Sequence, residues 1–170
     1  MVTPSFNHGQ FIEDTICSIL TQRGDFYIDY VIIDGKSSDE TVKIIEKYEK
    51  LLKENCSIKE INGRSFYVSK NTDFKFNHCL GISYRYISEK DEGYGDALNK
   101  GFSMTFGEVM AWLNSDDKYH VDAFQRVSNI FGSFVDVDWI VGKNTWWNEK
   151  GELTGESMVL KNFYDFIFGA

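Results

Sequence analysis

The chain has 170 residues and a formal net charge of −8, with 42% hydrophobic and 16% aromatic residues. This length and composition are typical of one folded domain with a buried core, and they exclude a disordered chain. The acidic balance argues against a nucleic-acid-binding surface, which would be basic, so we expect no nucleic-acid partner.

Apolar periodicity predicts strands and helices in alternation along the chain. The predicted strands cover residues 2–6, 30–33, 82–87, 109–113 and 138–142. The predicted helices cover residues 11–20, a segment that follows residue 40, and residues 92–104, 121–131 and 158–168. Strands that alternate with helices predict an α/β fold with a mostly parallel sheet.

Three local patterns add detail to this prediction. Ser37 and Glu40 have the spacing of a capping box at the start of the second helix. Residues 57–80 are less regular and predict a hairpin-like insertion with its tip at 70–73. A second hairpin is expected around residues 148–151, and we expect one of the two tryptophans that precede it to lie in the core.

Polar residues follow four of the predicted strands. They occur at residues 4–7, 34–37, 88–91 and 114–117, and three of the four segments carry an acid. Ligands of parallel sheets bind at the carboxyl ends of the strands. Carboxylates there can accept hydrogen bonds from ribose hydroxyls or from a base, and Gly93 would let the backbone approach a ligand closely.

The segment after the predicted strand 109–113 offers the strongest indication of a metal. Asp116 and Asp117 are adjacent carboxylates, and they repel each other unless a cation or solvent separates them. Oxygen ligands of this kind suit Mg²⁺ or Mn²⁺. A solvated turn is the alternative, because Asn, Ser and Asp are common turn residues.

Seven short motifs occur in the order in which one enzyme family carries them. They are residues 2–7, 18–22, 32–41, 88–93, 96–101, 107–108 and 113–117. On these motifs the chain resembles a family 2 glycosyltransferase with the GT-A fold, an α/β/α sandwich with a mostly parallel central sheet. The closest subset is that of bacterial enzymes of surface-polysaccharide assembly at the cell envelope.

The resemblance implies a nucleotide-diphosphate sugar donor, which would be a UDP-, GDP- or dTDP-sugar. It places the donor against residues of the predicted strand 2–6, of the four polar segments and of the predicted helix 92–104. These residues are Thr3, Pro4, Ser5, Asn7, Asp34, Lys36, Asp91, Gly93, Asn99, Asn114 and Ser115. Asp116 matches the last acid of the family's DxD motif, and Asp117 would help it to hold the metal. Asn114 replaces the first acid, as is common in this subset.

The implied reaction is a hexosyltransferase-like transfer with inversion to a hydroxyl of a saccharide or lipid-linked acceptor. An Asp or Glu would act as the base, and the family carries it downstream of the DxD segment. Asp165, Glu156 and Glu149 are weak candidates that no motif surrounds. We therefore expect a single domain over residues 1–170 that is truncated on its acceptor side, with the base beyond Ala170.

Two alternatives stay open at this point. The chain could be a non-catalytic nucleotide-sugar-binding or assembly domain of the same fold. A nucleotidyltransferase is a weaker alternative, because residues 5–9 lack the basic side chains of that class. The sequence does not indicate an oligomeric state.

Location is predicted from what the sequence lacks. No apolar run approaches the roughly 18 residues of a membrane-spanning helix, and the first residues lack the regions of a signal peptide. Cys17, Cys56 and Cys79 have no metal-ligand spacing and cannot all pair with one another. We therefore expect a cytoplasmic protein, with peripheral attachment at the inner face of the membrane as an open alternative.

Overall fold

The computed structural model describes residues 1–148, 150 and 152–156. The chain divides into two compact units, Met1–Ser128 and Asn129–Ala170, and each is described by itself. The expectation of a single domain over residues 1–170 stays a prediction. None of the described helices is long and apolar enough to cross a membrane.

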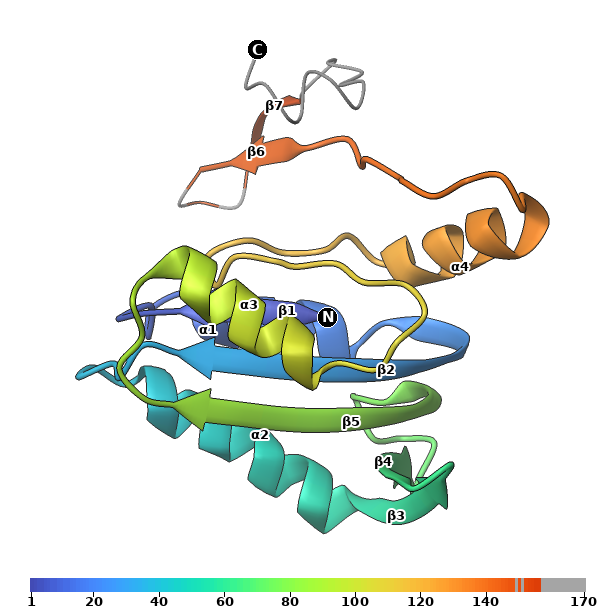
Figure 1. The fold of residues 1–170 in the computed structure, drawn as a ribbon, viewed down its shortest axis with the longest axis horizontal. Coiled ribbons are helices and arrows are strands. Elements are labelled where there is room, and N and C mark those ends of the chain that lie inside the picture. The colour runs from blue at the N-terminus through green and yellow to red at the C-terminus, as the bar shows by residue number, and fades with distance from the viewer. Residues whose placement is uncertain (149, 151, 157–170) are drawn as a thin grey trace. The chain divides into compact units, whose positions relative to one another are not determined.

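A five-stranded sheet in the order β1-β2-β5-β4-β3 forms the centre of the first unit (Figure 1). Its strands are β1 (Val2–Ser5), β2 (Arg23–Asp34), β3 (Cys56–Ile61), β4 (Arg64–Ser69) and β5 (His78–Ser88). β1, β2 and β5 are parallel, and the β3–β4 hairpin extends the sheet in antiparallel fashion. This mostly parallel sheet confirms the predicted α/β class.

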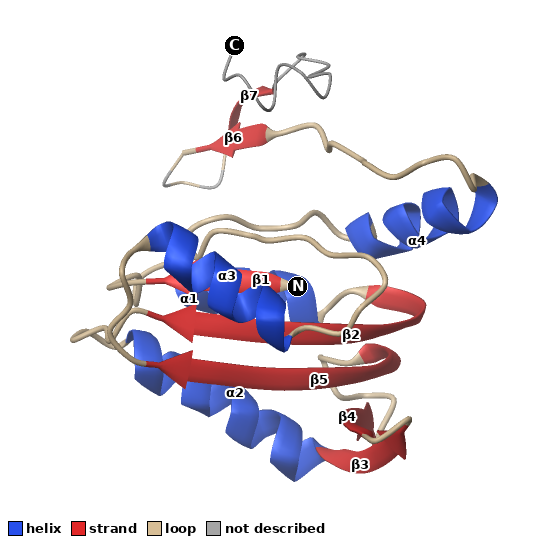
Figure 2. Ribbon diagram, in the orientation of Figure 1, coloured by secondary structure: helices blue, strands red, loops and turns tan. Residues whose placement is uncertain are grey.

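Helices lie on both faces of this sheet (Figure 2). They are α1 (Ile12–Leu20), α2 (Thr41–Asn55) and α3 (Tyr94–Met104). Because side chains alternate along a strand, β2 contributes residues to two hydrophobic cores, one on each face of the sheet. Tyr30 and Ile32 are buried with α1 and α2, whereas Val31 and Ile33 pack with Ala97 of α3. The result is the predicted α/β/α sandwich, with β2 buried on both faces.

α3 lies close to the sheet because it carries a glycine at the contact. A Cβ atom on Gly101 would lie 2.3 Å from Cγ1 of Val2 and 3.3 Å from Cγ1 of Ile33. No larger residue fits there without displacing the helix or β1. The position of α3 matters for the site, because Tyr94 in its first turn bonds to Asn114.

Two predictions about caps and turns in the first unit are wrong. Glu40 precedes α2 without a side-chain cap, and the Ser37 hydroxyl donates instead to a carboxylate at the end of β2. The hairpin turns at Asn62 and Gly63, rather than at residues 70–73. Positive φ angles of 51° and 74° at those two residues suit a type I′ turn. This Asn-Gly pair is therefore the turn signal that the prediction missed.

The apolar run at residues 109–113 is not a buried strand, contrary to the prediction. It makes one parallel bridge, between Trp112 and Val2, with two backbone hydrogen bonds of 3.0 Å. Met110 is 63% exposed. Pro4 is the next residue of β1 whose backbone faces this segment, and it has no N–H to continue the ladder.

Helix α4 (Ala123–Ser133) crosses the boundary between the units, and the second unit contains a hairpin of β6 (Thr145–Trp147) and β7 (Leu153–Glu156). The hairpin was predicted. Trp146 and Trp147 are 54% and 52% exposed, so the expectation that one lies in the core is wrong. Residues 138–142 form no strand, and the predicted helix at 158–168 lies outside the described residues.

Candidate functional site

The carboxyl ends of the three parallel strands lie in one row. Ser5 of β1 is in register with Asp34 of β2, which is in register with Ser88 of β5. The backbone continues the row, because Gly35 N donates to Ser5 O (2.8 Å) and Glu89 N donates to Asp34 O (3.0 Å). In Figure 1 the tips of β2 and β5 point to the same side, where the following loops gather.

Asp34 is the fully buried centre of this row. Its carboxylate accepts hydrogen bonds from Ser37 N (2.9 Å), from the Ser37 hydroxyl and from the Ser88 hydroxyl (2.6 Å). Three donors satisfy most of the acceptor capacity of a carboxylate. Asp34 therefore ties the loop after β2 to the end of β5. Beside it, the buried Ser5 hydroxyl has no hydrogen-bond partner among the described residues.

The loops after β1 and β2 hold each other through Asn7. Its backbone N donates to the Ser37 hydroxyl (2.8 Å), and its Oδ1 accepts from Ser38 N (2.9 Å). Asn7 and Lys36 have positive φ angles of 53° and 66°, which few residues other than glycine adopt. These bonds fix two of the predicted polar segments against each other.

Asp39 fastens the same pair of loops to α2. Its Oδ2 accepts from Gly9 N (2.9 Å), and its Oδ1 accepts from the backbone N (3.0 Å) and hydroxyl (2.5 Å) of Thr41. The Thr41 hydroxyl, together with the two backbone donors, lowers the pKa of Asp39 below its usual 3.8. Asp39 thus joins the loop after β1 to the start of α2.

The third polar segment lies against the second. Asp91 Oδ2 would lie 3.0 Å from a Cβ atom built on Gly35, so a larger residue at this position would push the carboxylate away by a few tenths of an ångström. Asp91 Oδ1 accepts from Gly93 N (2.9 Å). Gly93 precedes α3 with a φ of 109° and has open space at its Cβ position.

The fourth segment, residues 114–117, is held from two directions. Thr15 of α1 is fully buried, and its hydroxyl lies 2.9 Å from Ser115 O and 2.8 Å from Asp117 O. His8 Nδ1 and the Ser115 hydroxyl form a hydrogen bond of 2.6 Å. The segment is therefore an ordered loop at the sheet edge, although the residues before it form a single bridge and no strand.

Tyr94 and the two acids complete this loop. The Tyr94 hydroxyl donates to Asn114 Oδ1 (3.0 Å), and Asn114 Nδ2 donates to Asp117 Oδ2 (3.2 Å). Desolvation and the charge of Asp116 raise the pKa of Asp117 above its usual 3.8. Asp116 itself is exposed. Negative charge is thus concentrated at the edge where α3 begins.

The protein groups at this loop fit a divalent ion only in part. Within the described residues no three or more His, Cys, Asp or Glu side chains are arranged to hold a metal. Asp116 and Asp117 supply carboxylate oxygens, and Asn114 supplies an amide oxygen. Mg²⁺ commonly binds one or two carboxylates together with substrate phosphates. The site therefore fits such an ion when a diphosphate supplies the other ligands.

The other residues predicted for donor binding and catalysis lie in β1, in α3, in the second unit or outside the described residues. Thr3 and Pro4 are buried within β1, and the Thr3 hydroxyl accepts from the Tyr30 hydroxyl (3.1 Å). Asn99 is exposed on α3. Glu156, a candidate base, pairs with Lys143 in the second unit. Glu149 and Asp165 lie outside the described residues.

Three residues at the site were missed by the sequence prediction. His8, Thr15 and Tyr94 contact the loop at 114–117 from segments 20 to 107 positions away. No partner of His8 stands at a recognisable spacing in the sequence. The contact is set by packing, so a local sequence pattern could not reveal it.

The family model described as "Glycosyl transferase family 2" matches residues 1–81 and 75–145. Because the match covers most of the chain, the protein belongs to glycosyltransferase family 2. This confirms the family that the seven motifs indicated. All four polar segments at the sheet edge lie within the matched residues.

Two curated relatives are named as glycosyltransferases of bacteria. One, named as the teichuronic acid biosynthesis glycosyltransferase TuaG of Bacillus subtilis (strain 168), is 28% identical over 126 residues, which are 74% of this chain and 38% of that protein. The poly(ribitol-phosphate) beta-N-acetylglucosaminyltransferase TarP of Staphylococcus aureus (strain N315) is 28% identical over 147 residues, 84% of this chain and 35% of that protein. The chain therefore spans somewhat more than a third of their length.

Solved structures show the same fold. The crystal structure of S. aureus TarS residues 1–349 in complex with UDP superposes with a TM-score of 0.54 and 18% identity, over 77% of this chain and 31% of that one. TarS residues 1–349 with UDP-GlcNAc give a TM-score of 0.51 and 19% identity, over 77% of this chain and 30% of that one. These likenesses and the mixed sheet are consistent with the GT-A fold.

Proposed function

We propose that the sheet edge binds the nucleotide-diphosphate sugar donor of an inverting glycosyltransferase. The observation that carries the proposal is the ordered loop at 114–117. His8 and Thr15 hold this loop against the strand-end row, with Asp116 and Asp117 side by side. A loop held in this way fixes the backbone that carries both carboxylates, and desolvation together with the charge of Asp116 raises the pKa of Asp117.

In this proposal each polar segment has its own task. Asp91 and Ser5 take the nucleoside, since the Asp91 carboxylate lies against Gly35 at the end of β2 and the Ser5 hydroxyl lacks a partner among the described residues. Asp34 orients the Ser37 loop and reaches the nucleoside only if that loop opens. Gly93 lets the start of α3 approach the diphosphate, where backbone N–H groups favour an anion.

Asp116 and Asp117, with Asn114, would hold Mg²⁺ or Mn²⁺ together with the donor diphosphate. A divalent ion there supplies positive charge that stabilises the leaving diphosphate. In the transfer itself the acceptor hydroxyl oxygen forms a bond to the anomeric carbon as the bond to the diphosphate breaks. The hydroxyl proton goes to a carboxylate base.

The donor base and the acceptor are proposed from the similar proteins. TarS has been crystallised with UDP and with UDP-GlcNAc, so UDP is the first nucleotide to test, before GDP and dTDP. The names of TuaG and TarP refer to teichuronic acid and poly(ribitol phosphate). A cell-wall saccharide or a lipid-linked precursor is therefore our proposed acceptor, and a cytoplasmic location stays a prediction.

Calorimetry with UDP, GDP and dTDP, each with and without Mn²⁺, tests the proposal. We expect one nucleotide to bind, and to bind more tightly with Mn²⁺, whereas Mn²⁺ alone binds weakly because the protein supplies few ligands. Asp116→Ala should abolish the gain from Mn²⁺. Asp25→Ala, an exposed acid at the opposite end of β2, is the matched control and should keep it.

Each result has a clear reading. If none of the three nucleotides binds, the proposal is wrong. An unchanged gain from Mn²⁺ in Asp116→Ala would show that the metal site is misplaced. Binding of a nucleotide sugar without its turnover, in the presence of saccharide acceptors, would favour a non-catalytic binding domain of the same fold.

A further inference from the structure

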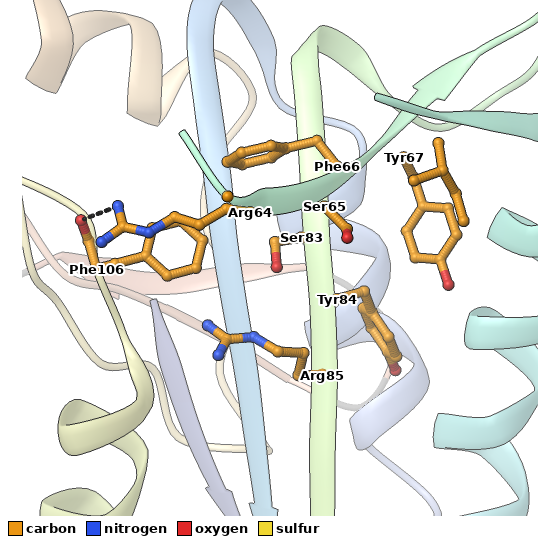
Figure 3. A pocket seen from close by; sticks show the side chains of 10 residues that line it. Arg64, Ser65, Phe66, Tyr67, Ser83, Tyr84, Arg85 and Phe106 are labelled. Atoms are coloured by element: carbon orange, nitrogen blue, oxygen red, sulfur yellow. Dashed lines mark hydrogen bonds between the residues drawn. The ribbon is translucent and has the colours of Figure 1, made fainter. Parts of the chain in front are cut away.

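A cleft of about 350 Å³ lies between the β3–β4 hairpin and β5, away from the strand-end row (Figure 3). Ser83 and Arg85 line it from β5, and Arg64, Ser65 and Phe66 line it from β4. Arg85 precedes the end of β5 by three residues, which is about 10 Å along a strand. The cleft is therefore separate from the proposed donor site.

Two arginines share one aromatic ring at this cleft. The guanidinium carbon of Arg64 lies 3.9 Å from the centroid of the Phe106 ring, and that of Arg85 lies 5.0 Å from it. Figure 3 shows both guanidinium groups beside this ring. The chain has only four arginines. The ring attracts each cation, but the two cations repel each other.

Nearby acids neutralise only one of these charges. Asp29, 5% exposed, pairs with Arg85 at 2.5 Å and also accepts from Phe106 N (2.9 Å). Arg64 donates to Phe106 O at 3.4 Å, and in the described part of the chain no carboxylate pairs with it. Glu60, the acid nearest along the hairpin, accepts from the Ser65 hydroxyl. A net positive charge therefore remains at Arg64.

Arg85 also has an unused donor. Its buried Nε finds no hydrogen-bond partner among the described residues, and a buried donor without an acceptor destabilises the folded state. Ser83 is nearly buried beside it, at 5% exposed. The guanidinium groups of Arg64 and Arg85 thus line the cleft together with the hydroxyls of Ser65 and Ser83.

The other wall of the cleft is apolar. Phe66 is buried, and its ring is tilted by 53° against that of Tyr27, with centroids 4.7 Å apart. Ile58 is 64% exposed at the rim. The volume is at the small end of the range for small-molecule sites, about 300–1,000 Å³. The cleft therefore has room for one small organic group next to the charges.

From this geometry we infer that the cleft binds a phosphate or carboxylate group carried by a small organic molecule. The planar guanidinium forks of Arg64 and Arg85 match the oxygens of either anion. The organic part lies against Phe66 and Ile58. The inference does not depend on the proposed glycosyl transfer, because it uses none of the residues of the donor site.

The experiment follows the arginine Nε–H signals of the full chain by NMR. Phenyl phosphate, benzoate and the neutral benzyl alcohol are titrated separately. We expect saturable shifts of the Arg64 and Arg85 signals with phenyl phosphate or benzoate, and none with benzyl alcohol. The relative affinity of the two anions then distinguishes a phosphate site from a carboxylate site.

Arg64→Gln should weaken anion binding about tenfold, because it removes one charge-assisted contact. Arg126→Gln removes the same charge from an exposed position on α4 and should leave the affinity unchanged. Equal effects of the two variants, or no saturable shift with either anion, would overturn the inference and leave a structural stack on Phe106. UDP binding by Arg64→Gln should match that of the unmodified chain, so the two proposals fail separately.

Discussion

Thr15→Val is the sharpest test of how the fold holds the loop at 114–117. The hydroxyl of Thr15 is fully buried and lies within 2.9 Å of the carbonyl oxygens of Ser115 and Asp117. Valine has nearly the same shape, so the substitution removes the hydrogen bond without creating a cavity. The two carbonyl groups then lose their buried donor.

The size of the effect follows from the number of hydrogens. One hydroxyl hydrogen serves one acceptor at a time, so the loss is that of a single buried bond, about 1–2 kcal/mol in the free energy of unfolding. If the loop must be ordered to hold the metal and the diphosphate, the Mn²⁺-dependent affinity for UDP should fall by about five- to thirtyfold.

Urea unfolding measures the first quantity, and calorimetry with and without Mn²⁺ measures the second. Thr21→Val is the matched control, since its hydroxyl donates to Cys17 O (2.7 Å) at the end of the same helix. We expect Thr21→Val to leave the Mn²⁺-dependent affinity unchanged. Wild-type affinity in Thr15→Val, or an equal loss in both variants, would refute this role of Thr15.

Two further predictions concern stability. Gly101→Ala places a Cβ 2.3 Å from Cγ1 of Val2 and should lower the free energy of unfolding, measured in urea, by about 1–3 kcal/mol. Gly95→Ala in the same helix meets no atom within 4 Å and should not destabilise the protein. Equal losses in the two variants would contradict the packing argument. Asp39 has a lowered pKa through Thr41, so its contribution to stability is present above its usual pKa of 3.8 and is lost as the pH falls through its lower folded value. Asp39→Asn should therefore be less stable than the wild type at pH 7, with a difference that shrinks below about pH 4; a difference that is constant with pH in urea titrations would count against this role.

The sequence by itself determined the class of fold and indicated that the candidate site lies at the carboxyl ends of the strands. Apolar residues before Asp34 indicated a strand, and the structure buries Val31 and Ile32 on opposite sides of it. Such patterns depend on a period of two or of about four residues along a single element. The polar residues after the strands followed from the same local pattern, and the ordered motifs identified the family.

Only the tertiary structure decided which side chains meet. Thr15 reaches Asp117 across 102 positions of sequence, and Arg64 and Arg85 share the ring of Phe106 from three separate segments. The apolar run at 109–113 makes only a single bridge to β1, because Pro4 on that edge has no N–H to continue the ladder. Contacts of this kind depend on how the helices and strands pack in space, and a local period in the sequence carries no information about that.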